Sequence, residues 1–224
     1  MDTRLLLGHR GSPRRARENT LESFALALQD GLDGVELDVQ RSRDGVLVIH
    51  HDFDLEGVPL AELDWVEIKQ KAPWVPRLEE VFELFEAHPE AWINLELKSQ
   101  PPTSDGREAA LARLLGAWGG RGRAWVSSFD PLALIRLRRQ GLDVPLALLY
   151  AQEEVLELLP CLGVQGVHPH HSLLSREEVE RLRGQGYFVA TWTVNDARRA
   201  RELLEWGVRG VIGDVPDELK AARD

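Results

Sequence analysis

The chain has 224 residues, of which 43% are hydrophobic and 29% charged, and its formal net charge is -10. This composition excludes wholesale disorder, and an acidic surface excludes nucleic acid and anionic membranes as stable partners. The longest apolar runs are far shorter than the ~20 residues that cross a bilayer, and the start of the chain is too weakly apolar for a secretory signal. With one cysteine, Cys161, an intrachain disulfide is excluded. We therefore expect one cytoplasmic domain over residues 1–224, and composition assigns it no oligomeric state.

Short apolar runs alternate with amphipathic segments along the whole chain. Eight runs are typical of buried strands, at residues 5–8, 34–39, 92–97, 124–128, 145–149, 165–168, 187–193 and 210–213. Segments with a helical period lie between them, at residues 21–28, 78–85, 108–115, 132–139, 153–159, 177–183 and 197–206. This order favours an α/β fold, the (β/α)₈ TIM barrel, for which ~250 residues is typical. A doubly wound sheet is the alternative, but the sequence contains neither of the glycine-rich phosphate loops that such sheets usually carry.

One further apolar run follows the second strand too closely for a helix to intervene. Asp44-Gly45 precedes it and is a strong signal for a two-residue hairpin, so we expect this run to fold back antiparallel on the second strand. A turn centred on these two residues places Asp38 opposite His51 and turns His50 to the other side. A one-residue slip would exchange the two histidines. The prediction is a barrel with a short β-hairpin excursion after its second strand.

Charged residues gather at the C-terminal ends of the first three strands, where the active sites of such barrels lie. Glu36 and Asp38 are spaced by two on the second strand, as are Glu96 and Lys98 on the third, so each pair faces one way. Three carboxylates from neighbouring strands suit one hard divalent cation, Mg²⁺ or Ca²⁺. Arg10 follows the first strand, and together with Lys98 it adds the positive charge that a phosphate group needs. The pattern indicates a site for a small-molecule phosphate compound.

Two histidines complete this pattern. His9 ends the first strand, and His51 comes to the same side through the hairpin. Imidazole titrates near neutral pH, so one histidine can act as general base and the other as general acid. The sequence does not tell which is which. The chemistry indicated is displacement at phosphorus, with one histidine activating the nucleophile and the other protonating the leaving alkoxide.

At these residues the chain resembles the glycerophosphodiester phosphodiesterase family. The resemblance runs in order through most of the chain, and its motifs are Gly8-His9-Arg10-Gly11, Glu18-Asn19-Thr20, Glu36-Leu37-Asp38-Val39, His50-His51-Asp52, Val75-Pro76-Arg77-Leu78, Asn94-Leu95-Glu96-Leu97-Lys98, Trp192-Thr193-Val194-Asn195 and Gly213-Asp214-Val215-Pro216. It implies a TIM barrel that hydrolyses glycerophosphodiesters to an alcohol and sn-glycerol 3-phosphate. Two departures are the short stretch over residues 52–74, where relatives carry a longer insertion, and Gly213 in place of the usual threonine.

The resemblance also implies a role for each matching residue. By the family pattern the acid/base pair is His9 and His51, the metal ligands are Glu36, Asp38 and Glu96, the phosphate contacts are Arg10 and Lys98, and Trp192 belongs to the pocket for the glycerol or head group. His168 ends the sixth strand of the barrel and is a further candidate for lining the pocket. Asp52 is expected to orient its neighbours locally.

Two other functions stay open at this point. One is a lysophospholipase D, which uses the same chemistry on a lysophospholipid and needs an apolar groove for the acyl chain. The other is a catalytically silent barrel that binds a phosphate ligand. The intact set of histidines and carboxylates argues against the silent barrel, and the short stretch after His51 offers little sequence for an acyl groove.

Overall fold

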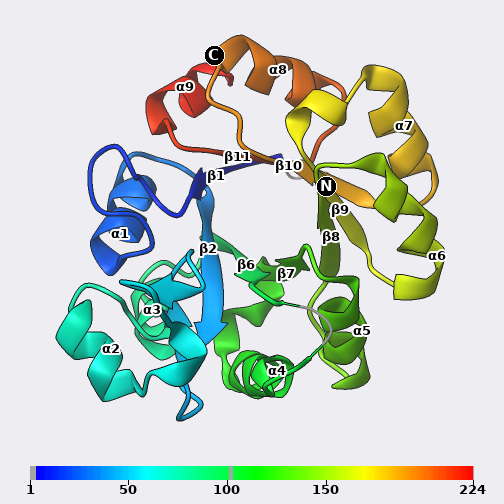
Figure 1. The fold of residues 1–224 in the computed structure, drawn as a ribbon. Helices are drawn as coiled ribbons and strands as arrows, with labels where there is room; N and C mark the ends of the chain where they lie inside the picture. The colour runs from blue at the N-terminus through cyan, green and yellow to red at the C-terminus, as the bar shows by residue number, and fades with distance from the viewer. Residues whose placement is uncertain (1–3, 101–102, 224) are drawn as a thin grey trace.

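The protein is described by a computed structural model that covers residues 4–100 and 103–223. Within these ranges eight parallel strands close into a barrel, because β1 pairs with both β2 and β11 (Figure 1). The barrel strands are β1 (Leu5–His9), β2 (Gly34–Arg41), β6 (Trp92–Leu97), β7 (Ala124–Ser128), β8 (Leu146–Tyr150), β9 (Gly166–Pro169), β10 (Phe188–Thr191) and β11 (Gly210–Gly213). The predicted TIM barrel is confirmed.

Helices surround the barrel, and with the exception of α2 they pack on the outward faces of its strands (Figure 1). They are α1 (Leu21–Gln29), α2 (Trp65–Lys71), α3 (Leu78–Glu86), α4 (Arg107–Ala117), α5 (Pro131–Arg139), α6 (Leu159–Leu162), α7 (Arg176–Gly184), α8 (Ala197–Glu205) and α9 (Pro216–Ala221). Thr20 caps α1 through its hydroxyl, and Asp130 caps α5, whose first residue is proline. Among the described residues, no helix is long and apolar enough to cross a membrane.

The helix expected over residues 153–159 forms only in part. Its place is taken by a 3₁₀ helix, η3 (Glu153–Leu158), followed by the four residues of α6. Pro160 has no N–H and cannot donate to a carbonyl one turn earlier, so a continuous α-helix cannot run through this segment. The helices α2 and α9 lie outside the segments predicted to be helical.

The predicted hairpin forms, but its register differs by one residue from the expected one. The returning strand β3 (Leu47–Ile49) pairs antiparallel with β2. The backbone N–H of His50 donates to the carbonyl of Asp38 at 3.0 Å, so these two residues lie opposite one another. The expected pairing of Asp38 with His51 is therefore wrong.

The extra residue lies in the turn. The carbonyl of Ser42 accepts from the N–H of Gly45 at 3.0 Å, and the N–H of Ser42 donates to the carbonyl of Val46 at 2.9 Å. Gly45 has a φ of 93°, a left-handed conformation that glycine adopts without strain. A three-residue loop with a glycine bulge thus replaces the two-residue turn, which shifts the register by one.

After β3 the chain makes an excursion outside the barrel before it enters α3 (Figure 1). It contains the small strands β4 (Asp54–Leu55) and β5 (Val58–Pro59), the 3₁₀ helix η1 (Leu60–Glu62) and α2. The buried residues that form a hydrophobic cluster of its own are Val48, Leu55, Leu60, Leu63, Ile68, Ala72 and Val75. The side-chain amide of Gln40 on β2 donates to the carbonyls of His50, His51 and Asp52. This anchor brings His51 to the mouth of the barrel although β3 has already ended.

The N-terminal end of the barrel is filled by aromatic side chains. Trp92, Trp125 and Phe188 pack there with ring centroids 5.4 Å from one to the next. A Cβ atom at Gly166 would lie 2.2 Å from the Phe188 ring, so glycine makes room for it. The Arg209 guanidinium lies over all three rings at 5.2 to 5.6 Å.

Candidate active site

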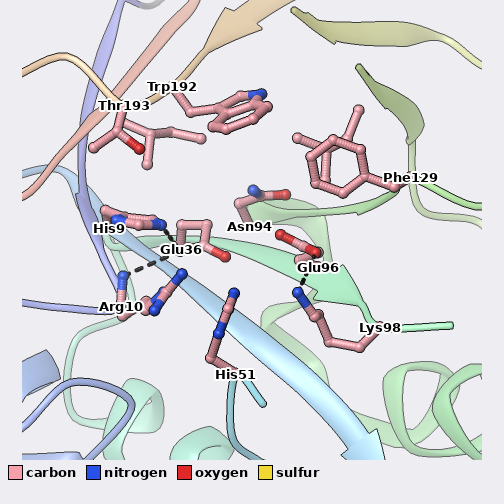
Figure 2. A pocket seen from close by; sticks show the side chains of 12 residues that line it. His9, Arg10, Glu36, His51, Asn94, Glu96, Lys98, Phe129, Trp192 and Thr193 are labelled. Atoms are coloured by element: carbon pink, nitrogen blue, oxygen red, sulfur yellow. Dashed lines mark hydrogen bonds and ion pairs between the residues drawn. The ribbon is translucent and has the colours of Figure 1, made fainter. Parts of the chain in front are cut away.

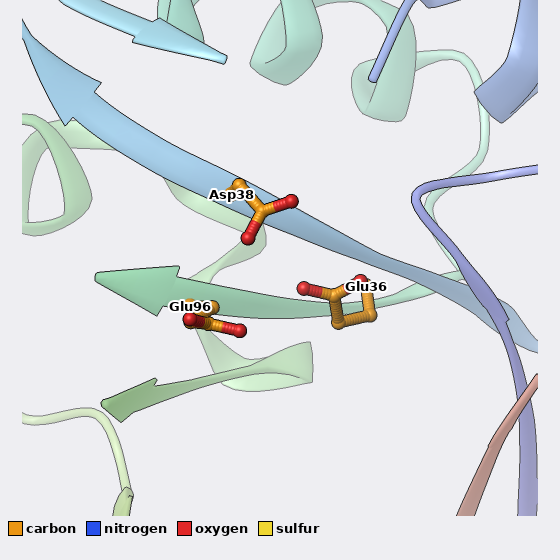
Figure 3. Close-up of side chains that lie close together, drawn as sticks. All are labelled: Glu36, Asp38 and Glu96. Carbon is orange, nitrogen blue, oxygen red and sulfur yellow. The ribbon is translucent and has the colours of Figure 1, made fainter. Parts of the chain in front are cut away.

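Three carboxylates meet at the C-terminal end of the barrel. Glu36 and Asp38 lie on β2 and Glu96 lies on β6, where it pairs directly with Asp38 (Figure 3). One oxygen from each of the three lies within 4.8 Å of the others. Alternation along the two strands turns all three side chains into the barrel, as their spacing predicts.

Burial and mutual repulsion disfavour the ionised form of these carboxylates. Burial, together with the charge of Asp38, raises the pKa of Glu36 to about 8. The same two causes, in the same order, raise the pKa of Glu96 to about 7, although Lys98 opposes them. The residues around the cluster therefore do not supply enough positive charge to keep all three carboxylates ionised at neutral pH.

Basic and amide groups contact the cluster from the side. The Lys98 ammonium lies 3.1 Å from Glu96 Oε1 and 3.6 Å from Asp38 Oδ1, and Arg10 Nε lies 3.3 Å from Asp38 Oδ2. The backbone N–H of Arg10 donates to Glu36 Oε2 at 3.0 Å. Asn19 Nδ2 donates to Asp38 Oδ2 at 2.8 Å. The predicted Arg10 and Lys98 thus lie beside the carboxylates.

Both predicted histidines line the cavity (Figure 2). Each also has a carboxylate on its Nδ1 atom. His9 Nδ1 lies 2.7 Å from Asp214 Oδ1, and His51 Nδ1 lies 2.8 Å from Asp52 Oδ1. These contacts leave the Nε2 atoms for the cavity, where His9 Nε2 lies 3.9 Å from Glu36 Oε2. Burial lowers the pKa of His9, but the hydrogen bond to Asp214 and the charge of Glu36 outweigh it and raise the pKa above its ordinary value.

The cavity between these residues has a charged side and an apolar side. Figure 2 shows the rings of Trp192 and Phe129 across from the basic residues. The two rings lie edge to face, with centroids 5.4 Å apart. Leu149 and Ile212 also line the cavity. The indole N–H of Trp192 donates to the carbonyl of His168 at 2.9 Å, so the ring offers the cavity only its carbon face.

His168 itself lies inside the barrel, fully buried, and it is not among the residues that line the cavity. Burial lowers its pKa to about 3, and within the described part of the chain neither ring nitrogen has a hydrogen-bond partner. The expectation that it lines the pocket is therefore corrected. Its ring instead packs against the rings of Trp125 and Phe188, with centroids 6.0 Å away, although its strand neighbour Leu149 does line the cavity.

Charged groups of both signs, two histidines and an apolar wall suit a phosphate ester with a carbon-rich arm. The profile of the Glycerophosphoryl diester phosphodiesterase family matches residues 9–218. The chain belongs to this family. It is an enzyme of this kind, a glycerophosphodiester phosphodiesterase.

Relatives of this phosphodiesterase match it over nearly their full length. The glycerophosphodiester phosphodiesterase of Caldanaerobacter subterraneus subsp. tengcongensis is 28% identical, with 96% of each chain covered. That of Bacillus subtilis is 29% identical, with 96% of this chain and 85% of the relative covered. A phosphodiesterase of Oleispira antarctica, solved with its product sn-glycerol-3-phosphate, has a TM-score of 0.89 and 29% identity, with 99% and 97% covered. A glycerophosphodiester phosphodiesterase from Thermotoga maritima has a TM-score of 0.80 and 28% identity, with 99% and 98% covered.

The carboxylate cluster of this phosphodiesterase fits a divalent cation. Its donors are all carboxylate oxygens, which hard cations prefer. Glu36 Oε1 is buried and has no hydrogen-bond partner among the described residues. An orphaned oxygen in a cluster of like charges costs stability unless a positive group meets it.

Sequence reasoning missed several residues that shape the site. Asp214 contacts His9, and Asn195 in turn donates to Asp214 at 2.7 Å. The motif that contains Asp214 follows β11 at the correct end of the barrel, which was the available signal. Asn19 also lies in a quoted motif, but nothing in its spacing indicates that it contacts Asp38. Phe129 follows β7 and had no signal besides its position at a strand end.

Proposed function

We propose that this phosphodiesterase hydrolyses glycerophosphodiesters to an alcohol and sn-glycerol 3-phosphate with one divalent cation held by Glu36, Asp38 and Glu96. The cation, when bound, neutralises the carboxylates and stabilises negative charge on the phosphate oxygens. The single observation that carries the proposal is that the three carboxylates of Glu36, Asp38 and Glu96 lie together beside the cavity that His9 and His51 line.

In the proposed reaction Arg10 and Lys98 contact the non-bridging phosphate oxygens. Both are held by a carboxylate of the cluster, so the Arg10 guanidinium and the Lys98 ammonium lie beside the position that a phosphate next to the cluster would take. Basic groups placed in advance stabilise the charge that develops during displacement at phosphorus.

His9 and His51 act as the general acid/base pair. One takes a proton from the attacking water at its Nε2 atom, and the other donates a proton to the leaving alkoxide. Asp214 and Asp52 support these roles, because a carboxylate on Nδ1 fixes the ring orientation and stabilises the protonated form. The product complex of the Oleispira antarctica relative supports sn-glycerol 3-phosphate as the product.

The apolar wall of Trp192 and Phe129 holds the carbon atoms of one arm of the diester. The Trp192 ring is fixed by its hydrogen bond to His168 and by edge contacts with Phe129 and His170. A fixed aromatic face contacts C–H groups without the loss of side-chain freedom that a mobile residue would suffer.

The test is to incubate the EDTA-treated enzyme with glycerophosphocholine or glycerophosphoethanolamine, add back single divalent cations, and measure sn-glycerol 3-phosphate. Product that appears only with a cation supports the proposal. Head-group release from a lysophospholipid alone would replace the substrate with the lysophospholipase D alternative. Binding of sn-glycerol 3-phosphate without turnover of any diester would indicate the silent barrel.

A further inference from the structure

Two aromatic rings form a corner at the mouth of the cavity. Phe129 and Trp192 both line the cavity, and their planes stand at 86° with centroids 5.4 Å apart, so a face of each ring borders the same space (Figure 2). We infer that this corner receives the quaternary ammonium of a choline-type head group, and that Phe129 selects it. The inference deepens the proposed function and rests on it, because it names the arm of the diester that lies against the apolar wall.

The exposure of the corner indicates which arm it meets. Phe129 is 46% exposed although it lines the cavity, so the corner lies where the cavity opens to solvent. The glycerol arm is the same in every glycerophosphodiester, whereas the head group varies in size and needs room beyond the cavity. A corner that is open to solvent therefore suits the head group.

Charge keeps a cationic head group away from the other side of the cavity. Arg10 and Lys98 lie there, each paired with Asp38, and the carboxylates beside them are committed to a divalent cation in the proposed function. This side repels a head group that carries positive charge. The faces of aromatic rings carry the negative part of the ring quadrupole and attract a cation within about 6 Å of the centroid. A cationic head group is thus directed to the corner.

The corner favours a quaternary ammonium over a primary one. The Phe129 ring has no hydrogen-bond acceptor, and the Trp192 indole N–H is a donor that already pairs with the carbonyl of His168 at 2.9 Å. A primary ammonium carries N–H donors, which lose water at these rings without gaining an acceptor. A trimethylammonium has no N–H and presents only methyl groups, and aromatic faces recognise such a group.

The backbone holds Phe129 in place beside the Trp192 ring. The hydroxyl of the preceding Ser128 donates to the carbonyl of Leu97 at 2.8 Å and accepts the backbone N–H of Asp130 at 3.1 Å. One buried side chain thereby fixes the chain on both sides of Phe129. A corner that is formed in advance binds a head group without the cost of ordering its own side chains.

The experiment compares two diesters of the same shape and different charge. One is glycerophosphocholine, and in the other 3,3-dimethylbutanol replaces choline, so that a carbon atom takes the place of the nitrogen. The kcat/KM of the full chain is measured for each from release of sn-glycerol 3-phosphate at saturating divalent cation. We expect wild type to prefer glycerophosphocholine about tenfold over this neutral isostere. Phe129→Leu keeps an apolar side chain and removes one ring, so the preference should fall to about threefold.

The chain offers a matched control in Trp74. Its ring is exposed to a similar degree, 41%, and does not line the cavity, so Trp74→Leu should leave the preference unchanged. Each preference is a ratio within one variant, so a loss of folded protein cancels. Equal kcat/KM values for the two diesters in wild type, a Phe129→Leu variant with the wild-type preference, or an equal fall in Trp74→Leu would each overturn the inference. Hydrolysis of no diester at all would refute the proposed function together with it.

Discussion

Replacing Asp214 by asparagine tests the proposed role of His9 without changing the size of any side chain. The Asn195 amide orientation is fixed, because its Oδ1 accepts the backbone N–H of residue 214. Its Nδ2 donor would therefore attract the new amide oxygen to the former Oδ2 position. The new amide nitrogen is then placed towards His9 Nδ1, which must accept, so the imidazole proton moves to Nε2. A histidine in that tautomer cannot act as a base from the cavity side.

The expected loss follows from the bond that is broken. His9 Nδ1 and Asp214 Oδ1 are 2.7 Å apart, and a hydrogen bond to a charged group contributes about 1.5–3 kcal/mol. The Asp214 side chain is 29% exposed, so we take the lower half of that range. At about 1.4 kcal/mol for each factor of ten, kcat should fall about 10–40-fold in Asp214→Asn. The KM for glycerophosphocholine should change less, because Asp214 does not line the cavity.

The pH profile shows which role His9 performs. Burial lowers the pKa of His9, and Asp214 is the main group that raises it, so the pKa must fall in the variant. The limb of the kcat/KM profile that belongs to His9 moves to lower pH. Movement of the acidic limb identifies His9 as the base, and movement of the alkaline limb identifies it as the acid.

The assay is release of sn-glycerol 3-phosphate between pH 5 and pH 10 at saturating cation. Asp52→Asn is the matched control, because Asp52 contacts His51 and not His9, so the limb that belongs to His9 should keep its wild-type position. Unchanged thermal melting and cation affinity would show that the fold and the acidic cluster are intact. If kcat stays within about twofold and neither limb moves, the assignment of Asp214 as the residue that orients His9 is refuted.

Three further changes test other parts of the site. Glu36→Gln should abolish cation-induced stabilisation, which for wild type at about 100 times the Kd is about 2.7 kcal/mol, or about 5–10 °C in scanning fluorimetry. Without cation the variant should melt above wild type, by a margin that grows from about pH 5 to pH 8. Burial and Asp38 raise the pKa of Glu36 to about 8 in the folded protein, so the carboxyl ionises in the unfolded chain at lower pH and wild type loses stability over this range. Equal melting temperatures at all pH values would contradict this. Trp192→Leu should raise KM about 3–10-fold and Trp192→Phe should raise it less, because only the face of the ring contacts the substrate. KM values equal to that of wild type in both variants would refute the proposed role of the apolar wall. His168→Leu should keep kcat and KM within about twofold and should unfold at lower pH than wild type, as followed by circular dichroism. Burial lowers the pKa of His168 to about 3 in the folded protein, so wild type loses stability as pH falls from about 6.5. A large loss of kcat would show instead that His168 takes part in the site.

The fold and the charged residues of the site could be predicted because both depend on short-range patterns. Apolar runs of strand length mark the barrel, and a spacing of two places Glu36 and Asp38 on one face of β2. A hairpin signal brought His51 towards the same end, although the register was wrong because Ser42 and Gly45 form a longer turn than Asp44-Gly45 indicates. Patterns of this range do not distinguish a two-residue turn from one with a bulge.

Contacts between distant residues could not be predicted in the same way. Asp214 meets His9 across 205 positions of sequence, and only closure of the barrel between β1 and β11 brings them together. Asn19 reaches Asp38 because its backbone turns left-handed, which no periodicity signals. His168 shows the opposite error, because it was expected to line the cavity and is instead buried inside the barrel. A position near a strand end does not reveal whether the side chain reaches the cavity.

The two histidines belong to parts of the molecule that hold together by different means. His9 extends from a strand of the closed barrel, whereas His51 lies in the excursion, whose buried residues form a separate cluster. Such units can open locally at a lower free energy than the whole domain requires. Release of the Gln40 contacts would withdraw His51 and Asp52 together while every barrel strand stayed paired. Under the proposed role of His51, opening of this unit alone would therefore stop turnover while the barrel stays folded.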